Sequence, residues 1–174
     1  MSIQPDQTYL ARTFDDERYA WTRHPRVRRR AVVAEAALLT ALVAATLLAS
    51  TTDDGWPPWF FVAWTVGMLS FIPLHSVLNL GIRGVLDRDK RSLDEHQRRQ
   101  GERSHSAMGW PSTALTFAAF TGAVAVVAVT GHVAPALCLG FLLWLASGLL
   151  TYWHLAWTSP EEPADPDFAD DQVS

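Results

Sequence analysis

The sequence has few of the residues and motifs on which enzyme and metal chemistry usually depends. Its 174 residues include one cysteine, Cys138, which excludes an internal disulfide and a cluster of cysteine ligands. It contains no P-loop, no glycine-rich dinucleotide fingerprint, no nucleophile elbow and no zinc-protease histidine pair. These absences give no ground for assigning a catalytic residue, a cofactor or a metal ligand, and they leave enzyme activity uncertain.

Charged residues are also nearly absent from four long apolar runs, 31–50, 59–82, 112–130 and 133–157. A bilayer core of about 30 Å takes about 20 helical residues to cross, and each run has that length. In lipid only a helix satisfies every backbone group within one segment. The sequence therefore predicts an all-α integral membrane protein, a four-helix bundle of transmembrane spans in which the last two form a tight hairpin.

Lysine is rare, because Lys90 is the only one among 14 cations and the others are arginines. This arginine-rich and alanine-rich composition is typical of GC-rich bacterial genomes. Seven cations precede the first span and seven lie between the second and third, whereas the two remaining connections carry none. Since cytoplasmic loops are the ones enriched in Lys and Arg, the distribution predicts a bacterial plasma-membrane protein with both termini in the cytoplasm.

Three segments lie outside the spans in this interpretation. Residues 1–30 form a cytoplasmic N-terminal segment, residues 83–111 a cytoplasmic loop, and residues 158–174 an acidic tail. The tail is expected to be disordered, because prolines alternate with acids in it. The basic segments do not indicate nucleic acid as a partner, since their arginines flank the membrane and are interleaved with acids.

The loop 83–111 is the most distinctive of these segments. It is rich in helix-favouring residues, and opposite charges recur at helical spacing, as in Asp94 with Arg98. These features predict that the second span continues as a helix into the cytoplasm and ends near Gly101. The residues expected to dock a partner are Leu86, Leu93, Asp94, Glu95 and Arg98. The alternative is a solvated charged face with no docking role.

A short part of this loop resembles a known motif. The heptapeptide 92–98, Ser-Leu-Asp-Glu-His-Gln-Arg, is followed by Arg103 and is similar to the L-D-E-R-(E/Q) box of small, uncharacterised actinobacterial membrane proteins with four transmembrane helices. His96 stands where those proteins usually have an arginine. The resemblance implies the same architecture with a cytoplasmic loop, and it implies no activity.

Polar residues inside the spans mark the candidate site, because ionisable groups in the membrane are costly and often functional. Glu35 is the only carboxylate within the four runs. His75 and Asn79 are four residues apart and share one helix face, and His154 lies near the cytoplasmic end of the last span. These four residues are expected to converge in the inner leaflet.

Three interpretations of this constellation remain open. In the first, Glu35 pairs with an arginine and His75 hydrogen-bonds another helix, which gives a structural polar cluster. In the second, Glu35 and His75 relay protons or bind a small solute along a path. In the third, His75 and His154 are ligands of a haem or a metal ion, since histidine is a common ligand of both.

Small residues at every fourth position favour close helix packing in lipid, and the longest such row is Ala37, Ala41, Ala45 and Ala49. The row either packs inside the bundle or binds a second copy or a partner helix. Together with the charged loop, it favours a non-enzymatic accessory, regulatory or self-associating subunit, whose partners are the bilayer and a second copy or another membrane protein. The alternatives are an oligomeric transporter or channel for protons or small solutes, and a haem or metal redox protein.

Overall fold

The computed structural model describes residues 14, 16–53, 56–87, 93 and 95–160. Within them the regular structure is a short 3-10 helix, η1, and four long α-helices. Their bounds are η1 Glu17–Arg23, α2 Pro25–Ser50, α3 Pro58–Gly81, α4 Glu95–Thr130 and α5 Val133–Thr158. All four long helices have the length and hydropathy to cross a membrane. The prediction of an all-helical protein with four apolar spans is therefore confirmed.

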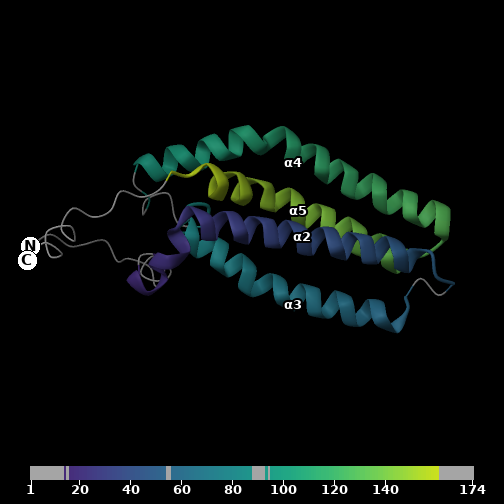
Figure 1. The fold of residues 1–174 in the computed structure, drawn as a ribbon. Coiled ribbons are helices and arrows are strands. Elements are labelled where there is room, and N and C mark those ends of the chain that lie inside the picture. Colours follow the sequence, from purple (N-terminus) through teal and green to yellow (C-terminus); the bar gives the residue numbers. More distant parts are fainter. Residues whose placement is uncertain (1–13, 15, 54–55, 88–92, 94, 161–174) are drawn as a thin grey trace, which may run out of the picture.

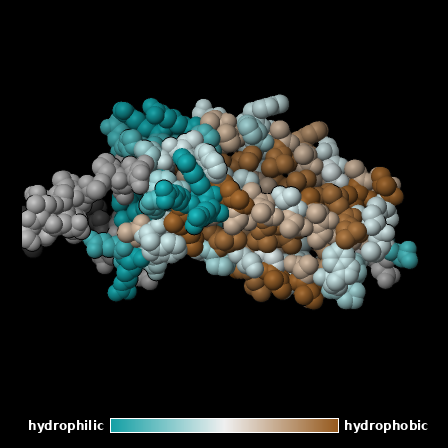
Figure 2. All heavy atoms as spheres, in the orientation of Figure 1, coloured by the Kyte–Doolittle hydropathy of each residue, from teal (hydrophilic) through white to brown (hydrophobic). Residues whose placement is uncertain are grey.

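The long helices lie side by side in the order α4, α5, α2, α3 (Figure 1). The central pair α5 and α2 pack on each other, while α3 packs mainly on α2 and α4 mainly on α5. The starts of α2 and α4 and the ends of α3 and α5 meet at one end of the molecule, which we call the charged end. On the face that Figure 2 shows, hydrophilic residues gather at this end, and apolar residues are frequent over the rest.

Two apolar clusters hold the central helices together. Leucines of α2 and α5 form the first one with side chains of α3 around them, and the second lies at the charged end. The buried members of the first cluster are Leu39, Leu42, Leu142 and Leu149. Those of the second are Ala31, Val32, Leu78, Ile82, Val85, Leu155 and Ala156. Gly67 permits the close approach of α3 to α2, since a Cβ there would lie 2.6 Å from a methyl carbon of Leu42.

The prediction that the second span continues as a helix to Gly101 is wrong. Helix α3 ends at Gly81, and the chain then turns through Arg83 and Gly84, whose φ angles are 55° and 60°. The Gly84 amide donates to the Asn79 carbonyl at 2.9 Å, which satisfies one of the carbonyls left open at the end of a helix. This left-handed turn, which the charge pattern does not encode, stops the helix.

The helical part of the loop belongs instead to the third span. Helix α4 begins at Glu95 and continues without interruption into the apolar run, and Glu95 pairs with Arg99 at 2.6 Å. Gly101 does not end this helix. A Cβ at Gly101 would lie 3.4 Å from a methyl of Val85, so the glycine lets α4 pack on the turn after α3.

The α4–α5 pair forms the predicted hairpin. Gly131 alone has a positive φ in this connection, 74°, and its amide donates to the Val127 carbonyl at 2.8 Å. Helix α4 is bent along its length (Figure 1) and contains Pro111, the kind of residue that bends helices by removing a backbone hydrogen bond.

The charged end is closed by the segment before α2 and by a buried arginine. Thr22 of η1 is fully buried, and a Cβ at Gly81 would lie 2.8 Å from its carbonyl oxygen. Arg28 points into the protein and donates to the carbonyls of Ser159 at 2.8 Å and Pro160 at 3.2 Å. These bonds fasten the end of α5 to the start of α2.

The turn after α3 should be sensitive to a side chain. Replacing Gly84 with alanine should destabilise the protein by at least about 1–2 kcal/mol, the cost of a left-handed conformation in a non-glycine residue. Its Cβ would also lie 2.5 Å from the Phe14 ring. Thermal or denaturant unfolding in a mild detergent measures the effect.

The matched control is Gly148→Ala on α5, where an added Cβ meets nothing within 4 Å. This change should leave stability equal or raise it by up to about 1 kcal/mol, because alanine favours helix over glycine. Equal effects of the two substitutions would contradict the assigned turn.

Candidate functional site

A single carboxylate, Glu35, joins three helices. It is 0% exposed and lies in the half of α2 nearer the charged end. Its Oε2 accepts a hydrogen bond from the Trp153 indole of α5 at 2.7 Å. Its Oε1 lies 3.2 Å from Nδ1 of His75 on α3. A buried carboxylate without partners would cost several kcal/mol, so pairing at both oxygens is what makes this position tolerable.

The His75 ring is held on two sides by aromatic rings. Phe71 stacks on it with centroids 5.4 Å apart, and Tyr152 meets it edge-on at 5.2 Å. When Glu35 is ionised its oxygen only accepts, so Nδ1 carries the hydrogen of this contact. The His75 side chain is 27% exposed, which makes it the accessible member of the pair.

A second polar group lies next to His75, around Asp87 in the turn after α3. Asp87 accepts hydrogen bonds from the Tyr152 hydroxyl at 2.6 Å and from the Asn79 amide at 2.5 Å. Tyr152 therefore contacts both the His75 ring and the exposed carboxylate. The carbonyl oxygen of the Asn79 side chain is buried without a hydrogen-bond partner.

His154 lies apart from both groups. Its Nδ1 is 3.0 Å from Oγ of Ser104 on α4, and that hydroxyl donates to the Thr151 carbonyl at 2.8 Å. Because the single hydroxyl hydrogen is used in this way, Ser104 accepts from Nδ1–H of His154. His154 thus links α5 to α4, whereas Trp153, the preceding residue, links α5 to α2.

The structure therefore brings together only part of the predicted constellation. Glu35 and His75 are in contact, Asn79 joins them through Asp87 and Tyr152, and His154 makes a different pair. The first interpretation gave Glu35 an arginine partner, and this part is corrected, since the second donor is Trp153. Its other part, a hydrogen bond from His75 to another helix, agrees with the contact between His75 and Glu35.

Sequence reasoning missed four residues of these groups: Asp87, Ser104, Tyr152 and Trp153. Two of them, Tyr152 and Trp153, are aromatic residues that carry a polar atom. Their polar atoms were the available signal, because a buried indole N–H or phenol hydroxyl normally finds a hydrogen-bond partner.

The predicted docking residues of the loop lie away from Glu35. Leu86 packs on the apolar cluster at the charged end, and Leu93 is half-buried. Glu95 and Arg98 are exposed on the first turns of α4, where Arg98 lies 3.6 Å from Glu102. Asp94 lies outside the described residues.

This arrangement is suited first of all to holding helices. Both oxygens of Glu35 face donors of the same chain, and the two imidazoles have different neighbours, Glu35 for His75 and Ser104 for His154. Among the described residues there is no group of three His, Cys, Asp or Glu side chains arranged to bind a metal ion. The exposed part of the site is His75 with Asp87.

Removing the indole donor tests how much the site stabilises the protein. Trp153→Phe keeps a ring but leaves Oε2 of Glu35 without its donor, so it should cost about 1.5–3 kcal/mol, the range for a hydrogen bond to a charged group. Unfolding of the purified protein in a mild detergent gives the difference.

The control is the same substitution at Trp144, on the same helix, which is 59% exposed. Trp144→Phe should change stability by no more than about 0.5 kcal/mol, as is usual for exposed sites. If Trp153→Phe were as mild as this control, the bond to Glu35 would not hold α5 in place.

Compared with known protein families, with curated proteins and with solved structures, the chain matches none of them.

Proposed function

We propose that this chain is a non-enzymatic, multi-pass protein of a bacterial plasma membrane that acts as an accessory or self-associating subunit. In this proposal both termini lie in the cytoplasm, and the protein binds a transmembrane helix of a second copy or of another membrane protein. The observation that supports it best is the exposed side of α4 next to its contact with α5, which we call the outer face of α4. Exposed arginines at the start of α2 and on the first turns of α4, both at the charged end, support the orientation.

The inner face of α4 is fixed to α5 by polar and small residues. The Ser112 hydroxyl donates to the Ser147 carbonyl, and the Thr116 hydroxyl lies 3.0 Å from Oγ of Ser147. Farther along, a Cβ at Gly140 would lie 3.3 Å from the Cβ of Ala123. Such contacts join helices in lipid, where no hydrophobic force does so. Helix α4 is therefore attached along its length and presents a defined outer surface.

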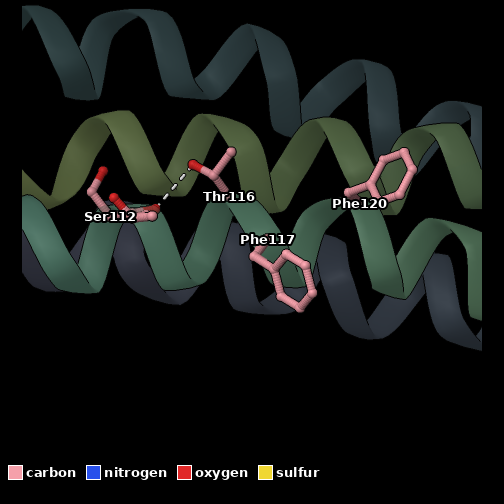
Figure 3. Close-up of a pocket in the computed structure, with 5 residues that line it drawn as sticks. Ser112, Thr116, Phe117 and Phe120 are labelled. Carbon is pink, nitrogen blue, oxygen red and sulfur yellow. Dashed lines mark hydrogen bonds between the residues drawn. The ribbon is translucent and has the colours of Figure 1, made fainter.

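The outer face of α4 begins at the hydroxyls of Ser112 and Thr116 that contact α5, and its shape suits a second helix. A shallow groove is lined by Ser112, Thr113, Thr116, Phe117 and Phe120, and the two phenylalanine rings project from α4 beside it (Figure 3). Phe117 and Phe120 are 69% and 71% exposed. Large rings next to small hydroxyl residues give the alternation of knob and hole by which helices interlock.

The position of α4 at an edge of the row of helices also supports the binding of a partner helix there. Helices α5 and α2 each have long neighbours on two sides, whereas α4 packs mainly on α5. A partner helix on α4 would extend the row. Two copies related by a two-fold axis would place this face against itself, as in most homodimers.

A transporter or channel for protons is the second candidate, favoured by the contact between buried Glu35 and part-exposed His75 beside Asp87. In that case Glu35→Gln should lower proton flux into liposomes at least about tenfold, the size expected when a proton-relay group is removed. A wild-type protein without flux above empty liposomes would reject this candidate.

Cysteine cross-linking in native membranes tests the main proposal. Because Cys138 is the only cysteine, Cys138→Ala gives a background into which Thr113→Cys can be placed in the α4 groove. Under mild oxidation, a second copy yields a disulfide-linked dimer. With a short thiol-to-amine cross-linker, a different membrane protein yields a larger adduct that mass spectrometry identifies.

The control position is Ser70 on the outer face of α3. Like Thr113, Ser70 is exposed, and its hydroxyl bonds back to its own helix. Thr113→Cys should give several times the cross-linked product of Ser70→Cys. Equal yields at the two positions, or no product at Thr113, would remove the support that α4 gives to the proposal.

A further inference from the structure

Three arginines at the start of α2 share one face. Arg26, Arg29 and Arg30 are three and four residues apart and exposed, while Arg28 lies on the opposite face and is buried. The buried Arg28 makes hydrogen bonds inside the protein, because it donates to the two carbonyls that follow α5. The other three present their guanidinium groups outward at the level where α2 leaves the apolar part of the molecule.

One of these arginines is oriented by a tryptophan of the neighbouring helix. The Arg29 guanidinium carbon lies 5.4 Å from the centroid of the Trp157 ring, near the end of α5. The bonds of Arg28 to Ser159 and Pro160 keep that end of α5 next to α2. A guanidinium that stacks on an aromatic face keeps its N–H groups free for an anion, so Arg29 is preorganised as a donor.

The charge of the three arginines is not neutralised by the described carboxylates. Within the part of the chain that the structure describes, no Asp or Glu forms a salt bridge with Arg26, Arg29 or Arg30. By contrast, the exposed Arg98 and Arg99 of α4 pair with glutamates of the same helix. An excess of positive charge at a membrane boundary attracts anionic headgroups.

The same face of α2 continues into the membrane as an apolar surface. Val33 is exposed one turn beyond Arg29 and Arg30, and Ala37 and Ala41 are exposed on the next turns. Along this face of α2, charged hydrogen-bond donors are therefore followed by small apolar side chains. A phospholipid has the same order of groups, with a charged headgroup followed by an acyl chain.

We propose that Arg26, Arg29, Arg30 and Trp157 form a binding site for the phosphate of an anionic phospholipid whose acyl chain lies along Val33. Guanidinium groups suit this ligand because each can donate two hydrogen bonds to phosphate oxygens. The site is formed by α2 and the end of α5, whereas the proposed interface is on α4, so it goes beyond the proposed subunit role. Its ligand would come from the surrounding bilayer.

Lipid retention tests this site in the full-length protein. The protein is extracted with a neutral detergent, equilibrated with equal amounts of phosphatidylglycerol and phosphatidylcholine, and analysed by native mass spectrometry. Phosphatidylglycerol should be retained preferentially. Replacing Arg26, Arg29 and Arg30 together with glutamine should weaken this retention by about fivefold for each arginine.

The matched control removes three positive charges from α4 by replacing Arg98, Arg99 and Arg103 with glutamine. This variant should retain phosphatidylglycerol as the wild type does. Trp157→Leu is a milder second variant, and it should lower retention without removing a charge. If the α2 triple variant fails to fold, Trp157→Leu still decides the question.

Three results would overturn the proposal. One is equal retention of the two lipids by the wild type, and another is equal loss in the α2 and α4 triple variants. The third is thermal stabilisation by inorganic phosphate alone as large as that by phosphatidylglycerol, which would assign the site to a free anion. None of these results bears on the α4 cross-links, so the two proposals fail separately.

Discussion

The buried Glu35 carboxylate is the constraint on which the arrangement of the central helices depends. A charge in a low-dielectric interior needs a donor for each oxygen, and these donors come from two other helices, Trp153 of α5 and His75 of α3. Sliding either helix by one turn would separate a donor from its oxygen by about 5 Å. Leucine packing is adaptable by comparison. The hydrogen bonds to Glu35 therefore fix the position of α3 and α5 along α2. The side chains of the two apolar clusters pack between the helices in that arrangement.

Different chemistry attaches the fourth helix. Helix α4 has no part in the Glu35 site, and it is joined to α5 by serine and threonine hydroxyls, a histidine and a glycine contact. Each of these bonds is weak, with an average near 0.6 kcal/mol for interhelical hydrogen bonds in membranes. Helices α2, α3 and α5 are thus joined through hydrogen bonds to Glu35, whereas α4 is held to α5 by several weaker contacts. Helix α4 also has an exposed face.

The spans were predictable because lipid imposes a length and an apolarity that a run of residues either has or lacks. The predicted ends at Ser50 and Thr130 and the start at Val133 agree with the structure. The end of α3 was not predictable, because it depends on a left-handed turn at Arg83 and Gly84 that Phe14 covers. The distances of Glu35 and His75 from the ends of their spans predicted that the two residues lie at the same depth in the membrane. The rotation of α5, which turns Trp153 toward Glu35 and His154 toward Ser104, has no signature in a nearly uniform apolar run.

The chain order of the site has a consequence for biosynthesis. Among the four spans, Glu35 belongs to the first in chain order, His75 to the second and Trp153 to the fourth. While the ribosome is still translating α5, the nascent chain holds a carboxylate in the bilayer with one of its two donors missing. Arg28 likewise cannot donate to the Ser159 carbonyl until the residues after α5 have been made. Arrest before that point therefore leaves an apolar hairpin that contains an acid with only one of its two hydrogen-bond partners.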